Sequence, residues 1–90
     1  MYAPVIPFFM NIELITPDRK VFAGEADRVK MPGIDGLFEV LNNHAPMIAA
    51  LKAGEVKITS KEGVKLFNII GGFAEILSNN VVILAEGIKA

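Results

Sequence analysis

The side chain best suited to chemistry in this 90-residue chain is its only histidine, His44, in the segment Asn-Asn-His-Ala-Pro. Catalysis by an imidazole needs a second reactive group within hydrogen-bond reach, and the adjacent residues offer only amides. The chain has no cysteine, and its two serines, Ser60 and Ser78, fall in polar turn sequences. We therefore expect a structural or contact role for His44 and no catalytic residue.

Two further sequence patterns resemble reactive sites, but each lacks a feature that the chemistry requires. A glycine loop at residues 32–36 could cradle a phosphate only if a helix followed it, because free helical N–H groups hold the anion. An apolar strand pattern, residues 37–41, follows instead. Asp35 and Glu39 would lie ~13 Å apart along one strand, beyond the roughly 9.5 Å limit of a glycosidase pair. We expect a tight turn that uses glycine for positive φ, and solvated carboxylates.

Composition and charge exclude several classes of function. One histidine with scattered carboxylates is too small a ligand set, so we expect no metal and no cofactor. The net charge is −1, and the nine basic residues are interleaved with acids, without the basic stripe of a nucleic-acid-binding protein. No apolar run approaches the ~20 residues of a membrane-spanning helix. The 52% hydrophobic content predicts either a tightly apolar core or apolar surface reserved for a partner.

Short strands separated by turns should position these residues. Residues 55–59 alternate strictly between polar and apolar, as a half-buried strand does, and no twelve-residue window has a helical period. Gly71-Gly72 interrupts an apolar run and predicts a sharp bend that lets one strand serve two sheets. Turn signals every eight to twelve residues indicate an antiparallel sandwich or barrel. The other candidate strands are residues 12–16, 21–22, 25–31, 37–41, 47–51, 64–70, 73–77 and 81–85.

The first ten residues differ from the rest. Residues 1–10 hold Pro4 and Pro7 and no charged side chain, and Met10 resembles a natural start. We expect residues 1–10 to be an apolar leader, flexible or added upstream, and residues 11–90 to form one β-sandwich domain. The alternative is that the leader covers a sheet edge.

From residue 11 onward, the order of motifs resembles the amino-terminal sandwich domain of the epsilon subunit of F-type ATP synthases. Each motif is weak alone, but five in order at the spacing of the family make a specific pattern. The motifs are Ile15-Thr16-Pro17 with Val21-Phe22-Ala23-Gly24, residues 32–38, residues 43–48 with 51–56, Gly71-Gly72-Phe73-Ala74-Glu75-Ile76, and residues 81–85.

This resemblance implies an all-β fold, a two-sheet antiparallel β-sandwich of about ten short strands. It implies a non-catalytic rotor subunit of the central stalk, which couples c-ring rotation to ATP synthesis through the gamma subunit and the c-subunit ring. Contact with the alpha/beta catalytic head would be indirect. Membrane association would come through the complex alone, at the cytoplasmic face of a bacterial inner membrane in preference to a plastid thylakoid or mitochondrial one.

The resemblance also implies two contact surfaces, and this sequence differs from the family pattern in two places. The c-ring-facing loop would comprise Pro32, Gly33, Ile34, Asp35, Gly36 and Leu37. The gamma-facing surface would comprise His44, Ala45, Pro46 and Met47. Leu37 stands where some relatives carry an acidic residue, so no charge pairing is implied there. Longer relatives continue into a carboxy-terminal helical hairpin, whereas this sequence stops at Ala90, and we expect neither a nucleotide site nor inhibition of hydrolysis.

Two other classes of protein fit the sequence less well than the rotor subunit. A free-standing sandwich that binds a peptide or a sugar should have aromatic-rich loops, but the chain has one tyrosine and six phenylalanines, most within apolar strands. A small hydrolase lacks a nucleophile paired with a base.

The substitution Met47→Glu tests the gamma-facing surface. We expect an intact fold and weaker binding to a gamma subunit, because a carboxylate would be desolvated in an apolar contact. Co-purification with gamma measures the effect, and unchanged binding would move the interface elsewhere on the sandwich.

Overall fold

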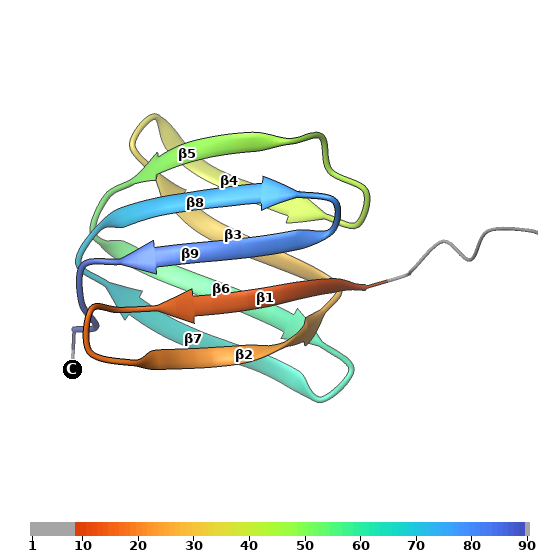
Figure 1. Cartoon of the computed structure of the whole chain (residues 1–90), viewed down its shortest axis with the longest axis horizontal. Helices are drawn as coiled ribbons and strands as arrows, with labels where there is room; N and C mark the ends of the chain where they lie inside the picture. Colours follow the sequence, from red (N-terminus) through yellow and green to blue (C-terminus); the bar gives the residue numbers. More distant parts are fainter. Residues whose placement is uncertain (1–8, 90) are drawn as a thin grey trace, which may run out of the picture.

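A computed structural model describes residues 9–89, which form a two-layered sandwich of β-strands (Figure 1). The all-β sandwich is confirmed, with nine strands in the described range where about ten were expected. The strands are β1 (Met10–Ile15), β2 (Lys20–Ala26), β3 (Arg28–Gly33), β4 (Gly36–Leu41), β5 (Met47–Leu51), β6 (Gly54–Ser60), β7 (Gly63–Ile69), β8 (Gly72–Leu77) and β9 (Asn80–Ala85).

The two layers are unequal and are joined at one corner. Five strands form one layer in the order β2-β1-β9-β8-β5, and four form the other in the order β4-β3-β6-β7. The pair Gly33↔Leu51 links β3 to β5 and carries the ladder from one layer into the other. One pair departs from the expected antiparallel pattern: β1 and β9 run parallel. These two strands come from opposite ends of the chain, so no hairpin dictates their relative direction.

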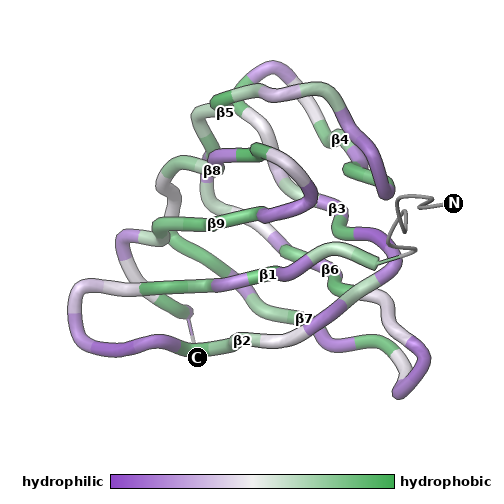
Figure 2. Tube along the Cα trace, turned by 45° about the vertical axis from the view of Figure 1, so that its right-hand side comes forward, coloured by the Kyte–Doolittle hydropathy of each residue, from purple (hydrophilic) through white to green (hydrophobic). Residues whose placement is uncertain are grey.

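The core lies between the layers and follows from the alternation of side chains along each strand. Ile12 and Leu14 of β1 face Val29 and Met31 of β3 across the interior, and all four are fully buried or nearly so. Burial of each such side chain contributes about 1.5–3 kcal/mol relative to exposure. Polar residues gather at the turns that connect the strands, as the colours of Figure 2 show.

One side of the sandwich is closed by aromatic rings and by the end of the chain. The ring centroids of Phe22 in β2 and Phe67 in β7 are 5.9 Å apart, and Lys65 Nζ lies 5.8 Å from the centroid of the Phe22 ring. The Ile70 amide donates to the Gly87 carbonyl at 3.1 Å, and the Lys89 amide donates to the Asn68 carbonyl. These contacts cover the edge of β7, whereas β4 and β5 lie on the opposite side.

The predicted bend at Gly71-Gly72 is one of the places where the chain crosses between layers. β7 ends at Ile69 in the four-stranded layer, and β8 begins at Gly72 in the five-stranded layer. Two separate strands therefore flank the bend, instead of one continuous strand. Both glycines have positive φ, at 146° and 149°, a region that side chains avoid.

Met10, part of the predicted leader, is the first residue of β1 and is 1% exposed. Residues 1–8 lie outside the described residues, so the division into a leader and a domain stays a prediction. Within residues 9–89 the structure contains no helix long and apolar enough to cross a membrane.

The substitution Gly72→Ala should destabilise the fold by about 3 kcal/mol or more, because backbone strain adds to a steric collision. A Cβ at this position would collide with the Leu84 carbonyl oxygen and lie 2.9 Å from Ala85 Cα. Urea unfolding measures the loss.

Gly63→Ala is the matched control, since Gly63 has φ of 118° and open space around its Cβ position. We expect a loss of about 1 kcal/mol there, from backbone strain alone. Equal losses at the two glycines would show that the layer crossing at Gly72 is not sterically constrained.

Candidate docking surface

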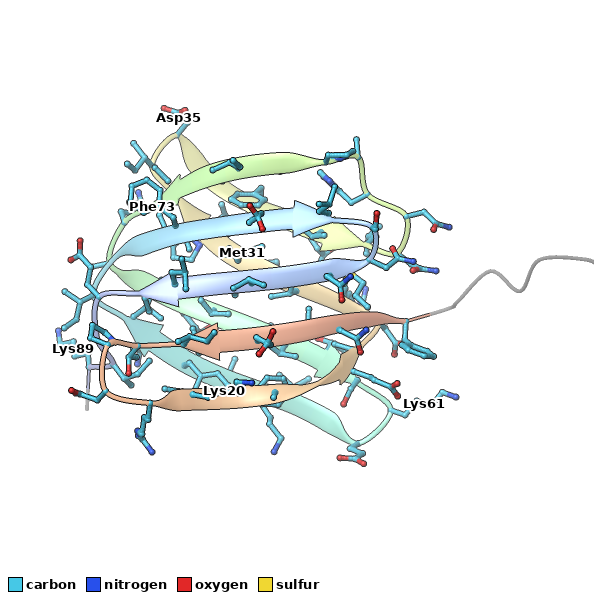
Figure 3. All side chains as sticks on the ribbon, viewed as in Figure 1. Lys20, Met31, Asp35, Lys61, Phe73 and Lys89 are labelled. Carbon is cyan, nitrogen blue, oxygen red and sulfur yellow. The ribbon has the colours of Figure 1, made fainter. Side chains whose placement is uncertain are left out.

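The predicted c-ring-facing loop is the tip of the β3–β4 hairpin. Gly33 pairs with Gly36 across the turn, and Gly36 has φ of 133°, which agrees with the expected use of glycine. Ile34, Asp35, Gly36 and Leu37 are exposed, and Figure 3 shows Asp35 at an extremity of the molecule. The accessible part of this loop is therefore residues 34–37.

The other two residues predicted for this loop are buried. Pro32 and Gly33 lie inside the sandwich, where Pro32 packs against Gly54 so closely that a Cβ on Gly54 would be 2.8 Å from Pro32 Cβ. The Pro32 carbonyl accepts a hydrogen bond from the Lys52 amide at 2.9 Å, which fixes the corner between the layers. These two residues position the loop and are not available to a partner.

The predicted gamma-facing residues form the connection between β4 and β5. His44 Nδ1 lies 2.7 Å from the Ala45 carbonyl oxygen, and the His44 amide donates to the Leu41 carbonyl. Ala45 and Pro46 are exposed, whereas His44 is half-buried. The recorded contacts of His44 therefore lie within its own loop, and its role stays a prediction.

Met47 is a less suitable test residue than the sequence indicates. Its side chain is half-buried and packs against the core cluster. A Met47→Glu substitution would bring a carboxylate to the edge of the core and lower the stability of the fold, so weaker binding alone would not locate the interface. Ile48, the next residue of β5, is 75% exposed and points away from the core.

The two predicted surfaces lie at opposite ends of β4. β4, whose first two residues belong to the hairpin tip, is six residues or about 20 Å long. A groove of about 480 Å³ runs between the β3–β4 hairpin and β5, and its apolar walls include Ile34, Leu37 and Ile48. The length of β4 leaves room for a different partner at each surface.

A larger exposed surface lies on the outer side of the five-stranded layer, and the sequence reasoning missed it. We call it the outer apolar face. Phe73 of β8 pairs with Ala50 of β5 and with Leu84 of β9, which pairs in turn with Ile15 of β1, so one apolar row crosses four strands. Phe73, labelled in Figure 3, and Leu84 are more than half exposed. The face comprises Ile15, Ile48, Ala50, Phe73, Leu77, Val82 and Leu84.

A signal for this face was present in the sequence. Residues 81–84 are all apolar, so two of the three outward positions of β9, Val82 and Leu84, lack the polar side chains that a solvated strand shows. The outer side of the four-stranded layer differs, because its outward positions include Arg28, Lys30, Glu39 and Lys57. Leu41 and Leu66 are also exposed on that side, but they lie opposite the charged residues Arg28 and Lys57. The excess hydrophobic content is therefore divided between the core and exposed positions on both layers.

The described residues contain no cluster of three side chains able to hold a metal ion. The hydrogen bonds of His44 within residues 9–89 join it to the Leu41 and Ala45 carbonyl groups, and neither is an acid, a base or a nucleophile. A flat apolar face, an exposed hairpin tip and a stiff core define a protein that docks onto other chains.

The chain belongs to the family described as ATP synthase, Delta/Epsilon chain, beta-sandwich domain, which matches residues 9–90. It is similar to the ATP synthase epsilon chain of Chlorobium limicola, with 40% identity over 88% of this chain and 91% of that protein. The epsilon chain of Caulobacter vibrioides is 42% identical over 86% of this chain and 90% of its own length. Some relatives are longer: the chain spans 61% of the epsilon chain of Leptospira borgpetersenii, at 38% identity.

Solved structures agree in fold. A chain in the mitochondrial ATP synthase of Euglena gracilis superposes with a TM-score of 0.87 at 20% identity, over 98% of this chain and 57% of that one. A chain in the central stalk and c-ring structure of the Tetrahymena thermophila enzyme gives 0.75 at 20% identity, over 89% and 65%. At this identity the likeness concerns the sandwich alone.

The substitution Asn79→Ala tests what holds the loop at residues 44–47 in place. The Asn79 side chain accepts a hydrogen bond from the Asn43 amide at 2.8 Å, which ties this loop to the β8–β9 turn. Asn79 also has φ of 62°. Loss of the bond and strain at alanine should lower the free energy of unfolding by about 1–2 kcal/mol.

Asn79→Gly is the matched control, because glycine accepts the positive φ but lacks the side chain. It should cost less than Asn79→Ala and should still increase the hydrogen exchange of the Asn43 amide. If neither variant changed that exchange, the loop would be held by other contacts.

Proposed function

We propose that this chain is a non-catalytic rotor subunit of the central stalk of F-type ATP synthase. The observation that carries the proposal is the outer apolar face, a docking surface on one side of a sandwich from the ATP synthase delta/epsilon family. The relatives named ATP synthase epsilon chain, which match over most of their own length, support it. A peptide- or sugar-binding module is not favoured, because the family and the epsilon-chain relatives support the rotor role.

The two proposed contact regions imply two partners. The outer apolar face, together with the adjoining loop at residues 44–47, would pack against the gamma subunit. The hairpin tip at residues 34–37 would meet the c-subunit ring. The length of β4, about 20 Å, leaves room for both contacts at the same time.

The role would be mechanical, and the fold is suited to it. Rotation of the ring would reach gamma through a packed interior that resists deformation. Both β3 and β5 run from one proposed contact region toward the other, and the Gly33↔Leu51 pair joins them. Force applied at residues 34–37 would therefore pass into the five-stranded layer through hydrogen-bonded backbone.

Membership of the family associates the chain with an energy-transducing membrane complex. We place it at the cytoplasmic face of a bacterial inner membrane. The bacterial origin of the relatives, among them Chlorobium limicola and Caulobacter vibrioides, supports this placement.

The substitution Leu84→Ser tests the proposed function on the unchanged fold. Leu84 is 53% exposed in the apolar row that crosses four strands of the outer apolar face, so its removal should weaken binding to a purified gamma subunit by roughly tenfold or more, because a large apolar contact is lost. Isothermal titration calorimetry measures the dissociation constant.

Leu66→Ser is the control, since Leu66 is 56% exposed on β7 in the other layer. We expect its binding to match that of the unsubstituted chain. Equal loss in both variants would assign the effect to stability, and no binding by the unsubstituted chain would overturn the proposed function.

A further inference from the structure

One charged residue interrupts the outer apolar face. Glu75 lies on β8 with Ile48 of β5 directly opposite on one side and Val82 of β9 on the other. Phe73 and Leu77 precede and follow it on the same side of β8. Its four nearest outward positions are therefore all apolar.

The other carboxylate at this level of the layer is already paired. Glu13 of β1 is opposite Val82 and makes an ion pair with Lys20 Nζ at 2.6 Å. Among residues 9–89 no corresponding ion pair is recorded for Glu75. Within this part of the chain, water therefore stabilises the Glu75 carboxylate and no ion pair does.

Docking of a partner on this face would remove that water. A carboxylate enclosed by apolar side chains is strongly unfavourable unless a cation and hydrogen bonds replace its hydration. A wholly apolar partner would therefore be rejected, and a partner with one matched cation accepted. Such a residue makes binding specific, because a partner surface without a cation at that position would leave the carboxylate unpaired.

We propose that Glu75 is the specificity-determining residue of the outer apolar face, and that its partner presents one arginine or lysine within an apolar surface. The inference rests on the proposed function and adds the chemistry of the contact. The cation would lie among side chains that fit against Ile48, Phe73, Leu77 and Val82.

A second copy of this chain is a poor occupant of the face. Two copies related by a two-fold axis through the face would bring their Glu75 carboxylates together or set each against apolar side chains. The other layer carries outward basic residues, namely Arg28, Lys30 and Lys57. Pairing them with Glu75 of a second copy would need a head-to-tail contact, which builds an open chain of copies and not a closed dimer. Charge thus favours a different protein.

The experiment compares Glu75→Gln, Glu75→Leu and Glu75→Lys for binding to the purified gamma subunit at low and high salt. We expect Glu75→Gln to weaken binding about tenfold and Glu75→Lys to weaken it further, because each leaves the cation of the partner unpaired. High salt should weaken the unsubstituted chain more than Glu75→Gln. Glu75 is exposed, so the variants should fold, and thermal unfolding checks this.

Glu55→Gln is the control, since Glu55 is an exposed strand glutamate of the four-stranded layer. Its binding should be unchanged. Sedimentation velocity gives a second measurement: the unsubstituted chain should remain monomeric, whereas Glu75→Leu should self-associate because its face is then continuous.

Tight binding by Glu75→Leu or Glu75→Gln, equal to that of the unsubstituted chain, would overturn this assignment and leave the proposed function standing. Failure of the unsubstituted chain to bind gamma would overturn both. Self-association of the unsubstituted chain through this face would show that the occupant is a second copy.

Discussion

The structure depends on the packing of two apolar sheet surfaces against each other. A strand turns alternate side chains to opposite sides, so only one side of each layer can enter the core. Ile12, Val29, Ile58 and Ile83 occupy such inward positions and are at most 1% exposed. In a domain of this size the interior cannot hold every apolar side chain. Some of the remaining ones form the outer apolar face of the five-stranded layer, and others, such as Leu41, Val64 and Leu66, are exposed on the four-stranded layer.

Glycine and proline fix how the two layers are joined. Gly72 lies where the chain crosses between them, and its backbone approaches the Leu84 carbonyl too closely for any side chain. At the other junction, Gly33 pairs with Leu51 while Pro32 fills the space beside Gly54. Gly72, Gly33 and Pro32 are buried within the sandwich. They determine the angle at which the exposed hairpin tip leaves the sandwich.

The candidate site was only partly predictable. The motif order identified the family, and the two loops that it marked are exposed at residues 34–37 and at Ala45 and Pro46. Local sequence could not show that Pro32 and Gly33 are buried, because Pro32 packs against Gly54 of β6 and Gly33 pairs with Leu51 of β5, some twenty residues later in the chain. The outer apolar face was missed for a similar reason: its members come from four strands that only the sheet order brings together.

The sequence by itself determined the strands, the turns, the lack of a catalytic pair at His44 and the family, because alternation, glycine and proline act over a few residues. Only the tertiary structure decided that β1 and β9 run parallel, that Phe73 and Leu84 lie side by side, and that Glu75 stands among apolar neighbours. The reason is physical: strand order and register are set by the packing of distant segments, and no local pattern encodes which strands become neighbours.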